Sequence, residues 1–123
     1  MKSVEVIEHQ GCAVTVLHLA NSKPDESIVV FREAQAHLSL QPPKSVRLLT
    51  DVTDVVFNQT SLAALQEFSR ANTPRIAVSA VVGADGLRSV ALRTIAFLTG
   101  RDIRACETRE EALEWLTSQA LKG

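Results

Sequence analysis

Two carboxylates, Asp51 and Asp54, lie three positions apart at the end of an apolar run that extends from residue 46 to residue 52. Paired carboxylates at the end of a strand can bind Mg²⁺ or transfer protons. Short acidic side chains in a turn also accept hydrogen bonds from nearby backbone N–H groups, which requires no ligand. The local pattern favours this turn role over a metal-binding or catalytic role.

The histidines show no spacing typical of a metal site. His9, His18 and His37 are expected in a turn, a strand and a helix, and no two are three or four residues apart, the spacing that places two imidazoles on one helical face. They also lie elsewhere in the sequence than Asp51 and Asp54, so no nucleophile, base and orienting group can be assembled there. We therefore expect no metal, no cofactor and no enzymatic activity.

Two adjacent hydroxyls, Thr60 and Ser61, fall in the first turn of a helix that Asn58 is suited to cap. Free N–H groups and the helix dipole would stabilise a phosphate at such a position. Helix initiation is the simpler role, and local chemistry alone favours it. We expect both side chains to face outward.

The loop Gly83-Ala84-Asp85-Gly86 could present backbone N–H groups and a helix start to an anion. The carboxylate of Asp85 would compete with that anion, and the loop matches neither a Walker loop nor a dinucleotide fingerprint. The pattern favours a turn that glycine permits, with Asp85 as a helix cap. Gly83, Asp85 and Gly86 remain the candidate ligand loop.

Composition predicts one soluble globular domain over residues 1–123, since 46% of the residues are hydrophobic and 22% are charged. The formal net charge of -1 leaves no basic field for nucleic acid. Arginines are frequent in the last third, but acidic residues are interleaved with them, so we expect a solvated, salt-bridged face. These arginines are Arg88, Arg93, Arg101, Arg104 and Arg109.

Targeting signals are not apparent in the sequence. The first ten residues lack the basic start and apolar run of a secretory signal, and no apolar stretch approaches the roughly 20 residues of a membrane span. Cys12 and Cys106 have no paired spacing and read as small buried side chains. We expect a cytoplasmic protein with reduced thiols.

Hydrophobic periodicity predicts strands that alternate with helices after an initial hairpin. His9-Gln10-Gly11 joins the hairpin strands, and Pro42-Pro43 stops the first helix. Thr108 to Glu111 has the form of a capping box for the last helix, which is expected to run toward Leu121. Strands are expected at 4–6, 12–16, 46–52, 76–82 and 103–106, and helices at 24–38, 59–72, 87–98 and 109–121.

The order β-β-α-β-α-β-α-β-α predicts an α/β fold with a five-stranded, mostly parallel sheet flanked by helices, the hairpin supplying an antiparallel edge. The apolar stretches around Leu49 and Val81 should be neighbours in that sheet. Ligands in such folds bind at the carboxyl ends of strands, so the loops 50–61 and 83–86 are the informative ones.

This order of elements, with Leu48-Leu49-Thr50-Asp51-Val52-Thr53 leading to Phe57 and a helix start that carries hydroxyls, resembles the STAS fold of anti-sigma-factor antagonists and sulfate-transporter tails. The chain is also similar to small uncharacterised SpoIIAA-like bacterial proteins of STAS/SEC14 type. That likeness covers nearly the whole chain and implies an architecture more than an activity. It is carried by Ala80-Val81-Val82-Gly83 with Gly86-Leu87, Thr99-Gly100-Arg101, and Glu110-Glu111-Ala112-Leu113-Glu114-Trp115-Leu116.

In STAS-type antagonists the third strand leads to an Asp-Ser-Ser-Gly-Leu motif, whose second serine is phosphorylated by a partner kinase. The matching stretch is Gln59-Thr60-Ser61-Leu62-Ala63. The resemblance thus implies Ser61 as the phosphorylated position and Thr60 as its neighbour, with glutamine in place of the aspartate and leucine in place of the glycine.

We therefore expect a non-enzymatic regulatory or protein-interaction domain, with a regulatory kinase or an anti-sigma factor as the partner that the resemblance implies. The alternative is a carrier of a small apolar ligand or lipid, suggested by the SEC14 likeness and by the apolar third helix. The hairpin edge would also permit a homodimer. The partner surface is expected at Asp51, Asp54, Phe57, Asn58, Thr60 and Ser61.

Overall fold

The computed structural model describes residues 3–85, 93 and 103–120 of the chain. The predicted helix at 87–98 and the candidate ligand residue Gly86 therefore lie outside the described residues, apart from Arg93. The described elements are β1 (Val4–His9), β2 (Cys12–His18), α1 (Pro24–Leu38), β3 (Val46–Asp51), α2 (Gln59–Asn72), β4 (Ile76–Val82), β5 (Ile103–Cys106) and α4 (Arg109–Ser118).

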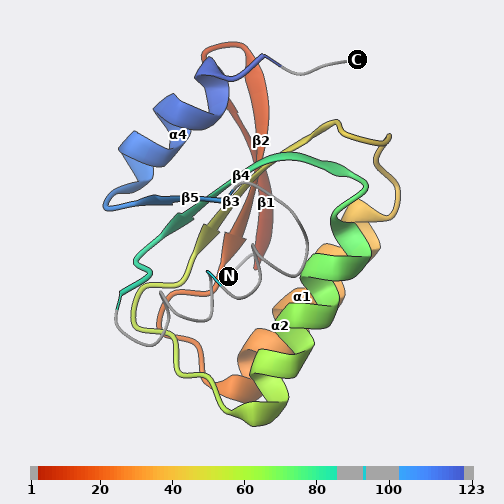
Figure 1. The fold of residues 1–123 in the computed structure, drawn as a ribbon, viewed down its shortest axis with the longest axis vertical. Coiled ribbons are helices and arrows are strands. Elements are labelled where there is room, and N and C mark those ends of the chain that lie inside the picture. The colour runs from red at the N-terminus through yellow and green to blue at the C-terminus, as the bar shows by residue number, and fades with distance from the viewer. Residues whose placement is uncertain (1–2, 86–92, 94–102, 121–123) are drawn as a thin grey trace.

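The strands form one five-stranded sheet in the order β1-β2-β3-β4-β5 (Figure 1). β1 pairs antiparallel with β2, and every other pair is parallel. Leu49 lies opposite Ala80, and Thr50 lies opposite Val81, so the two apolar stretches are neighbours as predicted. The predicted α/β architecture is confirmed.

A tight two-residue turn joins the antiparallel strands β1 and β2. Gln10 and Gly11 both have positive φ, 50° and 79°. Two consecutive residues of this kind make the primed turn whose twist matches that of the strands it joins. The predicted hairpin is therefore correct, but its turn is shorter than predicted, because His9 belongs to β1 and pairs with Cys12. Glycine lowers the steric cost at one of the two central positions.

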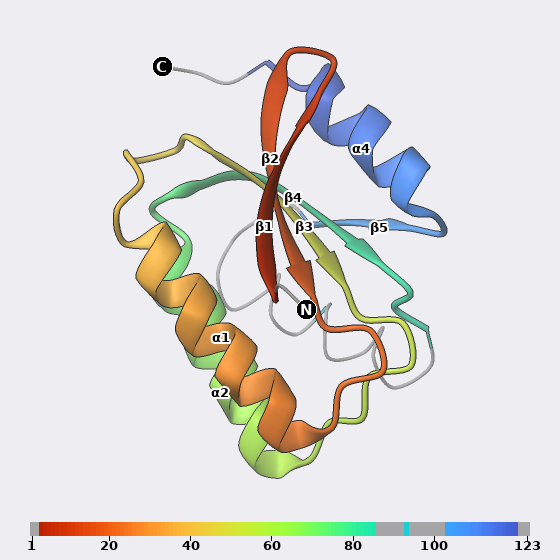
Figure 2. The same cartoon turned by 180° about the vertical axis from the view of Figure 1, so that it is seen from behind.

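Helices cover both faces of the sheet. α1 and α2 lie side by side on one face, with the rings of Phe31 and Phe68 stacked at 5.3 Å, and α4 lies on the other (Figures 1 and 2). The α1/α2 face holds the larger apolar core, which includes Leu17, Leu48 and Ile76. The α4 face holds a second core, formed by Val14, Val16, Leu49, Ala80, Val82, Cys106, Ala112 and Leu116.

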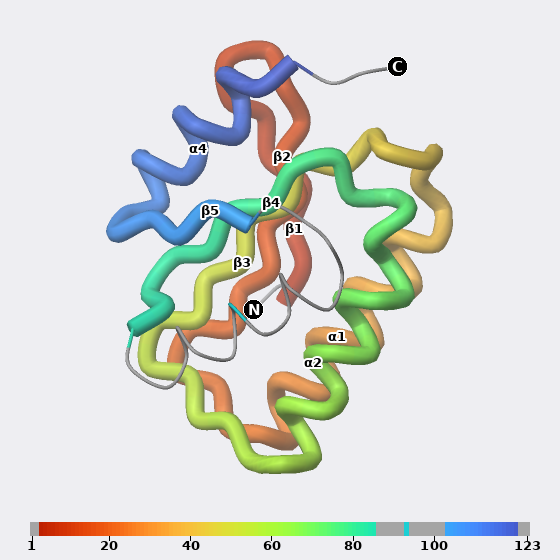
Figure 3. The backbone as a smooth tube through the Cα atoms, in the orientation of Figure 1, coloured from red at the N-terminus to blue at the C-terminus, as the bar shows by residue number. Residues whose placement is uncertain are grey.

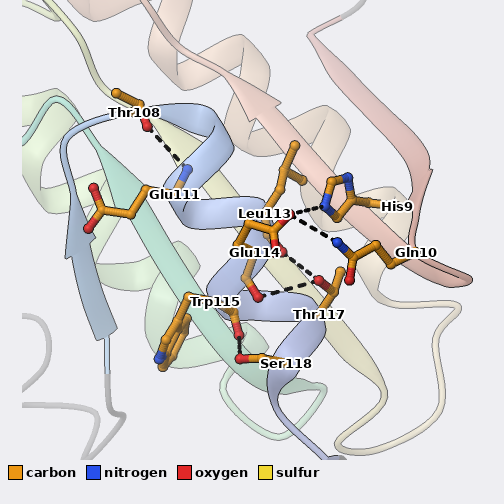
Figure 4. Close-up of polar contacts among 9 residues, drawn as sticks. All are labelled: His9, Gln10, Thr108, Glu111, Leu113, Glu114, Trp115, Thr117 and Ser118. Atoms are coloured by element: carbon orange, nitrogen blue, oxygen red, sulfur yellow. Dashed lines mark hydrogen bonds and ion pairs between the residues drawn. The ribbon is translucent and has the colours of Figure 1, made fainter.

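Polar contacts cap the start of α4 and hold its middle and end on the sheet. The Thr108 hydroxyl accepts from Glu111 N–H at 3.1 Å, so this half of the predicted capping box is formed. The Glu111 carboxylate accepts from Glu107 N–H at 3.3 Å instead of from Thr108. Glu114 accepts from Gln10 at 2.9 Å and lies 3.3 Å from the His9 ring, so the hairpin turn contacts the middle of the helix (Figure 4). Arg47 donates to two carbonyls at the end of the helix, at 3.0 and 3.1 Å.

The bounds of α4 correct one prediction. The helix ends at Ser118, because Gln119 is extended, with φ −84° and ψ 127°. The predicted continuation of the helix toward Leu121 is therefore wrong at Gln119, which is not helical. Leu121 itself lies outside the described residues.

Candidate functional site

Polar side chains converge where the parallel strands end. The chain leaves β2, β3 and β4 at the same edge of the sheet (Figure 3). Four residues form a row across this edge of the sheet: His18 pairs with Asp51, Asp51 with Val82, and Val82 with Cys106. This edge is where ligands of open α/β sheets usually bind.

Asp51 is the centre of this convergence. Its carboxylate is buried, with 9% of the side chain exposed. Thr53 donates to Oδ1 from its backbone N–H at 3.0 Å and from its hydroxyl at 2.7 Å. Arg109 donates to Oδ2 from Nε at 3.0 Å, and its Nη2 lies 2.9 Å from the same oxygen. Both carboxylate oxygens are thus satisfied, and the predicted turn role of Asp51 is confirmed. Its expected place on an exposed partner surface is not observed, because the side chain is buried.

Opposing effects act on the pKa of Asp51. Burial raises the pKa, but the hydrogen bonds from Thr53 and the hydrogen bond and positive charge of Arg109 lower it by more. The net result is a pKa below the ordinary value for an aspartate. At neutral pH, Asp51 is therefore a deprotonated carboxylate that accepts hydrogen bonds, and it has no proton to donate.

Arg109 extends the contacts of Asp51 across the sheet. Its Nη2 also lies 3.0 Å from His18 Nδ1, and His18 Nε2 lies 3.1 Å from Glu5 Oε1. We call Glu5, His18, Asp51, Thr53 and Arg109 the carboxyl-edge cluster. The expectation that the histidines lie away from the aspartates is wrong for His18, which reaches Asp51 through Arg109. Arg109 was expected on a solvated, salt-bridged face; it is partly exposed and does form a salt bridge, with the buried Asp51.

Asp54 does not join Asp51. Its side chain is exposed and its backbone has a positive φ of 55°, a conformation that aspartate tolerates in turns. Within the described part of the chain, no group of three or more His, Cys, Asp or Glu side chains could hold a metal ion.

The two described members of the candidate ligand loop, Gly83 and Asp85, have different surroundings. Gly83 has a φ of 82°, and a Cβ there would lie 2.7 Å from Thr53 Cα and would collide with the Thr53 hydroxyl. Glycine is thus required by a close approach to the turn that holds Asp51. Asp85 is exposed.

The segment from Asp54 to Thr60 links β3 to α2. Val56 is 59% exposed, and Asp54, Asn58, Gln59 and Thr60 are exposed as well. The segment is nevertheless held: Val56 N–H donates to Ser22 at 3.0 Å, and Val55 is buried. Phe57 is partly buried and packs against the core under α1 and α2.

Ser61 contradicts the expectation that it faces outward. Its side chain is fully buried. Asn58 Oδ1 accepts from Ser61 N–H at 2.8 Å, while Ser61 Oγ accepts from Asn58 N–H at 2.9 Å. This reciprocal pair is a capping box with serine in the position usually held by glutamate, so it draws the hydroxyl inward. Thr60, one residue earlier, is exposed as expected.

Cys106 ends the row at the edge of the sheet. It is a buried free cysteine, and burial, with a smaller contribution from Glu111, raises the pKa of its thiol. A thiol with a raised pKa is a poor nucleophile at neutral pH, which agrees with the small buried side chain predicted at Cys106. Cys12, for which burial was predicted as well, is only partly buried.

The sequence contained one signal that would have indicated the cluster. His18 and Asp51 each stand at the end of a predicted strand, and in the structure these two strands are adjacent and parallel, with His18 opposite Asp51. Only the adjacency of the stretches around Leu49 and Val81 was predicted, so the pairing of the strands that carry His18 and Asp51 was the missing step. Arg109 carried no such signal, because its reach depends on the placement of α4 across the sheet.

None of the helices in the described residues has both the length and the apolar character needed to cross a membrane.

Comparison with solved structures supports the fold. An uncharacterised protein from the DUF3478 family, with a SpoIIAA-like fold, from Shewanella loihica PV-4 matches with a TM-score of 0.73. The match covers 92% of this chain and 91% of that chain at 14% sequence identity. The fold of this chain is therefore SpoIIAA-like, as the sequence resemblance implied. No protein-family model and no curated protein matches the chain.

Proposed function

We propose that this chain is a non-enzymatic regulatory domain that binds a protein partner through the segment from Asp54 to Thr60, which we call the docking segment. The observation that supports this most strongly is an exposed apolar side chain on a backbone that is fixed by a hydrogen bond and by the packing of its neighbour. Val56 exposes 59% of its surface, although its own N–H is bonded to Ser22 and its neighbour Val55 is buried. Such a side chain can enter a partner's pocket with little loss of backbone entropy.

The chemistry beside the segment favours binding over catalysis. Asp51, the buried carboxylate nearest in sequence, has both oxygens occupied by Thr53 and Arg109. A general base needs a free lone pair within reach of its substrate. We therefore assign Asp51 the role of holding the turn from which the docking segment begins.

Regulation by phosphorylation, which the resemblance to STAS-type antagonists implies, is proposed at Thr60. Ser61 is buried and its hydroxyl is used in the helix cap, so a kinase would have to open the first turn of α2 to reach it. The Thr60 side chain is exposed at the second position of the helix. Phosphate there would add about −1.5 to −2 charges to the docking segment and weaken contact with an apolar or acidic partner.

The docking segment is tested by affinity capture with a matched pair of variants. Val56→Asp should reduce recovery of the partner by about tenfold or more, because it places a charge in an apolar contact. Leu40→Asp is the control: Leu40 is 82% exposed and precedes β3, at the opposite end of that strand. Equal recovery by Val56→Asp and the wild type would rule out the docking segment.

Thr60 is tested in the same assay. Thr60→Glu should lower recovery relative to Thr60→Val, which keeps the shape of threonine but has no hydroxyl to phosphorylate. Phosphate on Thr60 should be detected in the purified protein by mass spectrometry. Equal recovery by both variants would remove Thr60 from the mechanism while leaving the docking segment in place.

The proposed setting is the cytoplasm, in keeping with two cysteines that are both free in the structure. The alternative of a small-ligand carrier depended on the SEC14 likeness and on the apolar stretch 87–98, which apart from Arg93 lies outside the described residues. It stays a prediction, and native mass spectrometry of gently purified protein would test it.

A further inference from the structure

We propose that His18 is a pH-sensitive catch that fastens the first turn of α4 to the sheet and releases it when the imidazole is protonated. The catch is the part of the carboxyl-edge cluster that runs from Glu5 on β1 through His18 on β2 to Arg109 on α4. It is separate from the docking segment and does not depend on the function proposed for that segment.

The partners of His18 require one form of its ring. Arginine has only N–H donors, so His18 Nδ1, which is 3.0 Å from Arg109 Nη2, must be an acceptor. The proton of the neutral ring is then on Nε2, which donates to Glu5 Oε1 at 3.1 Å. Only the neutral Nε2–H tautomer makes both bonds.

Protonation of the ring would break one of these bonds and keep the other. A proton on Nδ1 would face the guanidinium N–H across 3.0 Å, so the hydrogen bond would be lost and two positive charges would repel. The bond from Nε2–H to Glu5 would persist and become charge-assisted. His18 would thus change from a bridge between β1 and α4 to a partner of β1 alone.

The charged groups that contact the catch determine which end of α4 it can release. Glu5 faces His18 from β1 and Arg109 faces it from α4, while Asp51 on β3 holds Arg109 at 2.9 Å. The pKa of Asp51 is lowered, so it keeps its charge while histidines titrate. Asp51 therefore keeps part of its hold on Arg109, and the expected change is a loosening of one helix end.

The first turn of α4 is the element that this loosening affects. α4 has 10 residues, and helices of this length depend on their contacts for stability. Its far end is held independently, because Arg47 donates to the carbonyls of Leu116 and Gln119. Acidification should therefore open the helix at Arg109 and leave the other end in place.

Hydrogen exchange of the backbone amides tests the catch. The protection factors of Glu111 and Ala112, whose N–H groups bond to Thr108, should fall by about tenfold between about pH 7.5 and about pH 5.5 in the wild type. His18→Gln should show no such fall, because the amide oxygen of glutamine accepts from Arg109 and does not titrate. The proposal would be overturned if these protection factors fell equally in His18→Gln, or if they did not fall in the wild type.

His9→Gln is the matched control. His9 also contacts α4, through Glu114 at 3.3 Å, but its protonation places a positive charge beside a carboxylate and should strengthen that contact (Figure 4). His9→Gln should therefore retain the acid-induced fall at Glu111 and Ala112. If the protection factors of Glu111 and Ala112 no longer fell on acidification of this variant, the effect would belong to His9 and the proposal for His18 would be contradicted.

A measurement without any variant covers the case in which His18→Gln does not fold. The ¹⁵N shifts of the His18 ring in wild-type protein at neutral pH distinguish the two neutral tautomers. The Nε2–H tautomer is expected, and the Nδ1–H tautomer, or a ring already protonated there, would overturn the proposal.

Discussion

At the scale of single residues, Asp51 makes a prediction about acid stability. Its folded-state pKa is lowered, so its contribution to stability is fully present above the unfolded pKa of about 3.9 and is lost as the pH falls through the folded value. Asp51→Asn should lower the free energy of unfolding by about 2 kcal/mol at neutral pH, because its amide turns a donor toward Arg109. The difference from the wild type should shrink below about pH 4.

Urea unfolding at several pH values measures this difference. Asp54→Asn is the control, since the Asp54 side chain is exposed and asparagine tolerates its positive φ. An Asp51→Asn variant as stable as the wild type at neutral pH would contradict the role assigned to this carboxylate.

The same scale shows which site residues local chemistry can predict. The turn role of Asp51 and the cap at Asn58 follow from contacts within three residues, and both were predicted correctly. The burial of Ser61 was missed because serine replaced the usual glutamate in the capping box, and the shorter side chain points back into the turn. His18 and Arg109 were missed because they are 91 residues apart and meet only in the tertiary structure.

At the scale of elements, the end of α4 gives a second prediction. Arg47 on β3 supplies two donors to carbonyls that the helix cannot satisfy itself. Arg47→Met keeps much of the aliphatic stem and removes both donors. Hydrogen exchange in the last turn of α4 should accelerate by about tenfold, as expected for the loss of about 1.4 kcal/mol of capping.

Arg32→Met, on the exposed side of α1, is the control for that experiment, and it should leave α4 unchanged. Unaltered exchange in the last turn of Arg47→Met would show that the apolar contacts of Leu116 hold this end without the arginine.

The elements themselves were predictable because their signals are local. Pro24 at the start of α1, the Gln10-Gly11 turn and the apolar run of β3 each act within a few residues. The end of α4 was harder to predict, because the helix ends where Arg47 donates hydrogen bonds to its last carbonyls. These two bonds join residues that are 69 and 72 positions apart in the sequence.

At the scale of the whole molecule, one sheet separates two apolar cores. The core under α1 and α2 includes Leu38, and the core under α4 includes Leu49 and Leu116. β3 contributes to both, since Leu48 faces one core and its neighbour Leu49 faces the other. Because the same strands line both cores, neither core can be lost without exposing the backbone that supports the other.

This sharing predicts that the two faces unfold together. Leu38→Ala should destabilise the chain by about 2–5 kcal/mol through the cavity it leaves. The only tryptophan, Trp115, packs against the opposite core, with Arg104 5.9 Å from its ring centre. Its fluorescence should nevertheless report the same lowered urea midpoint as circular dichroism, as a two-state transition requires. Leu40→Ala, at an exposed position, should leave both midpoints unchanged. A Trp115 midpoint that stays at the wild-type value while the circular dichroism midpoint falls would show that the two faces unfold separately.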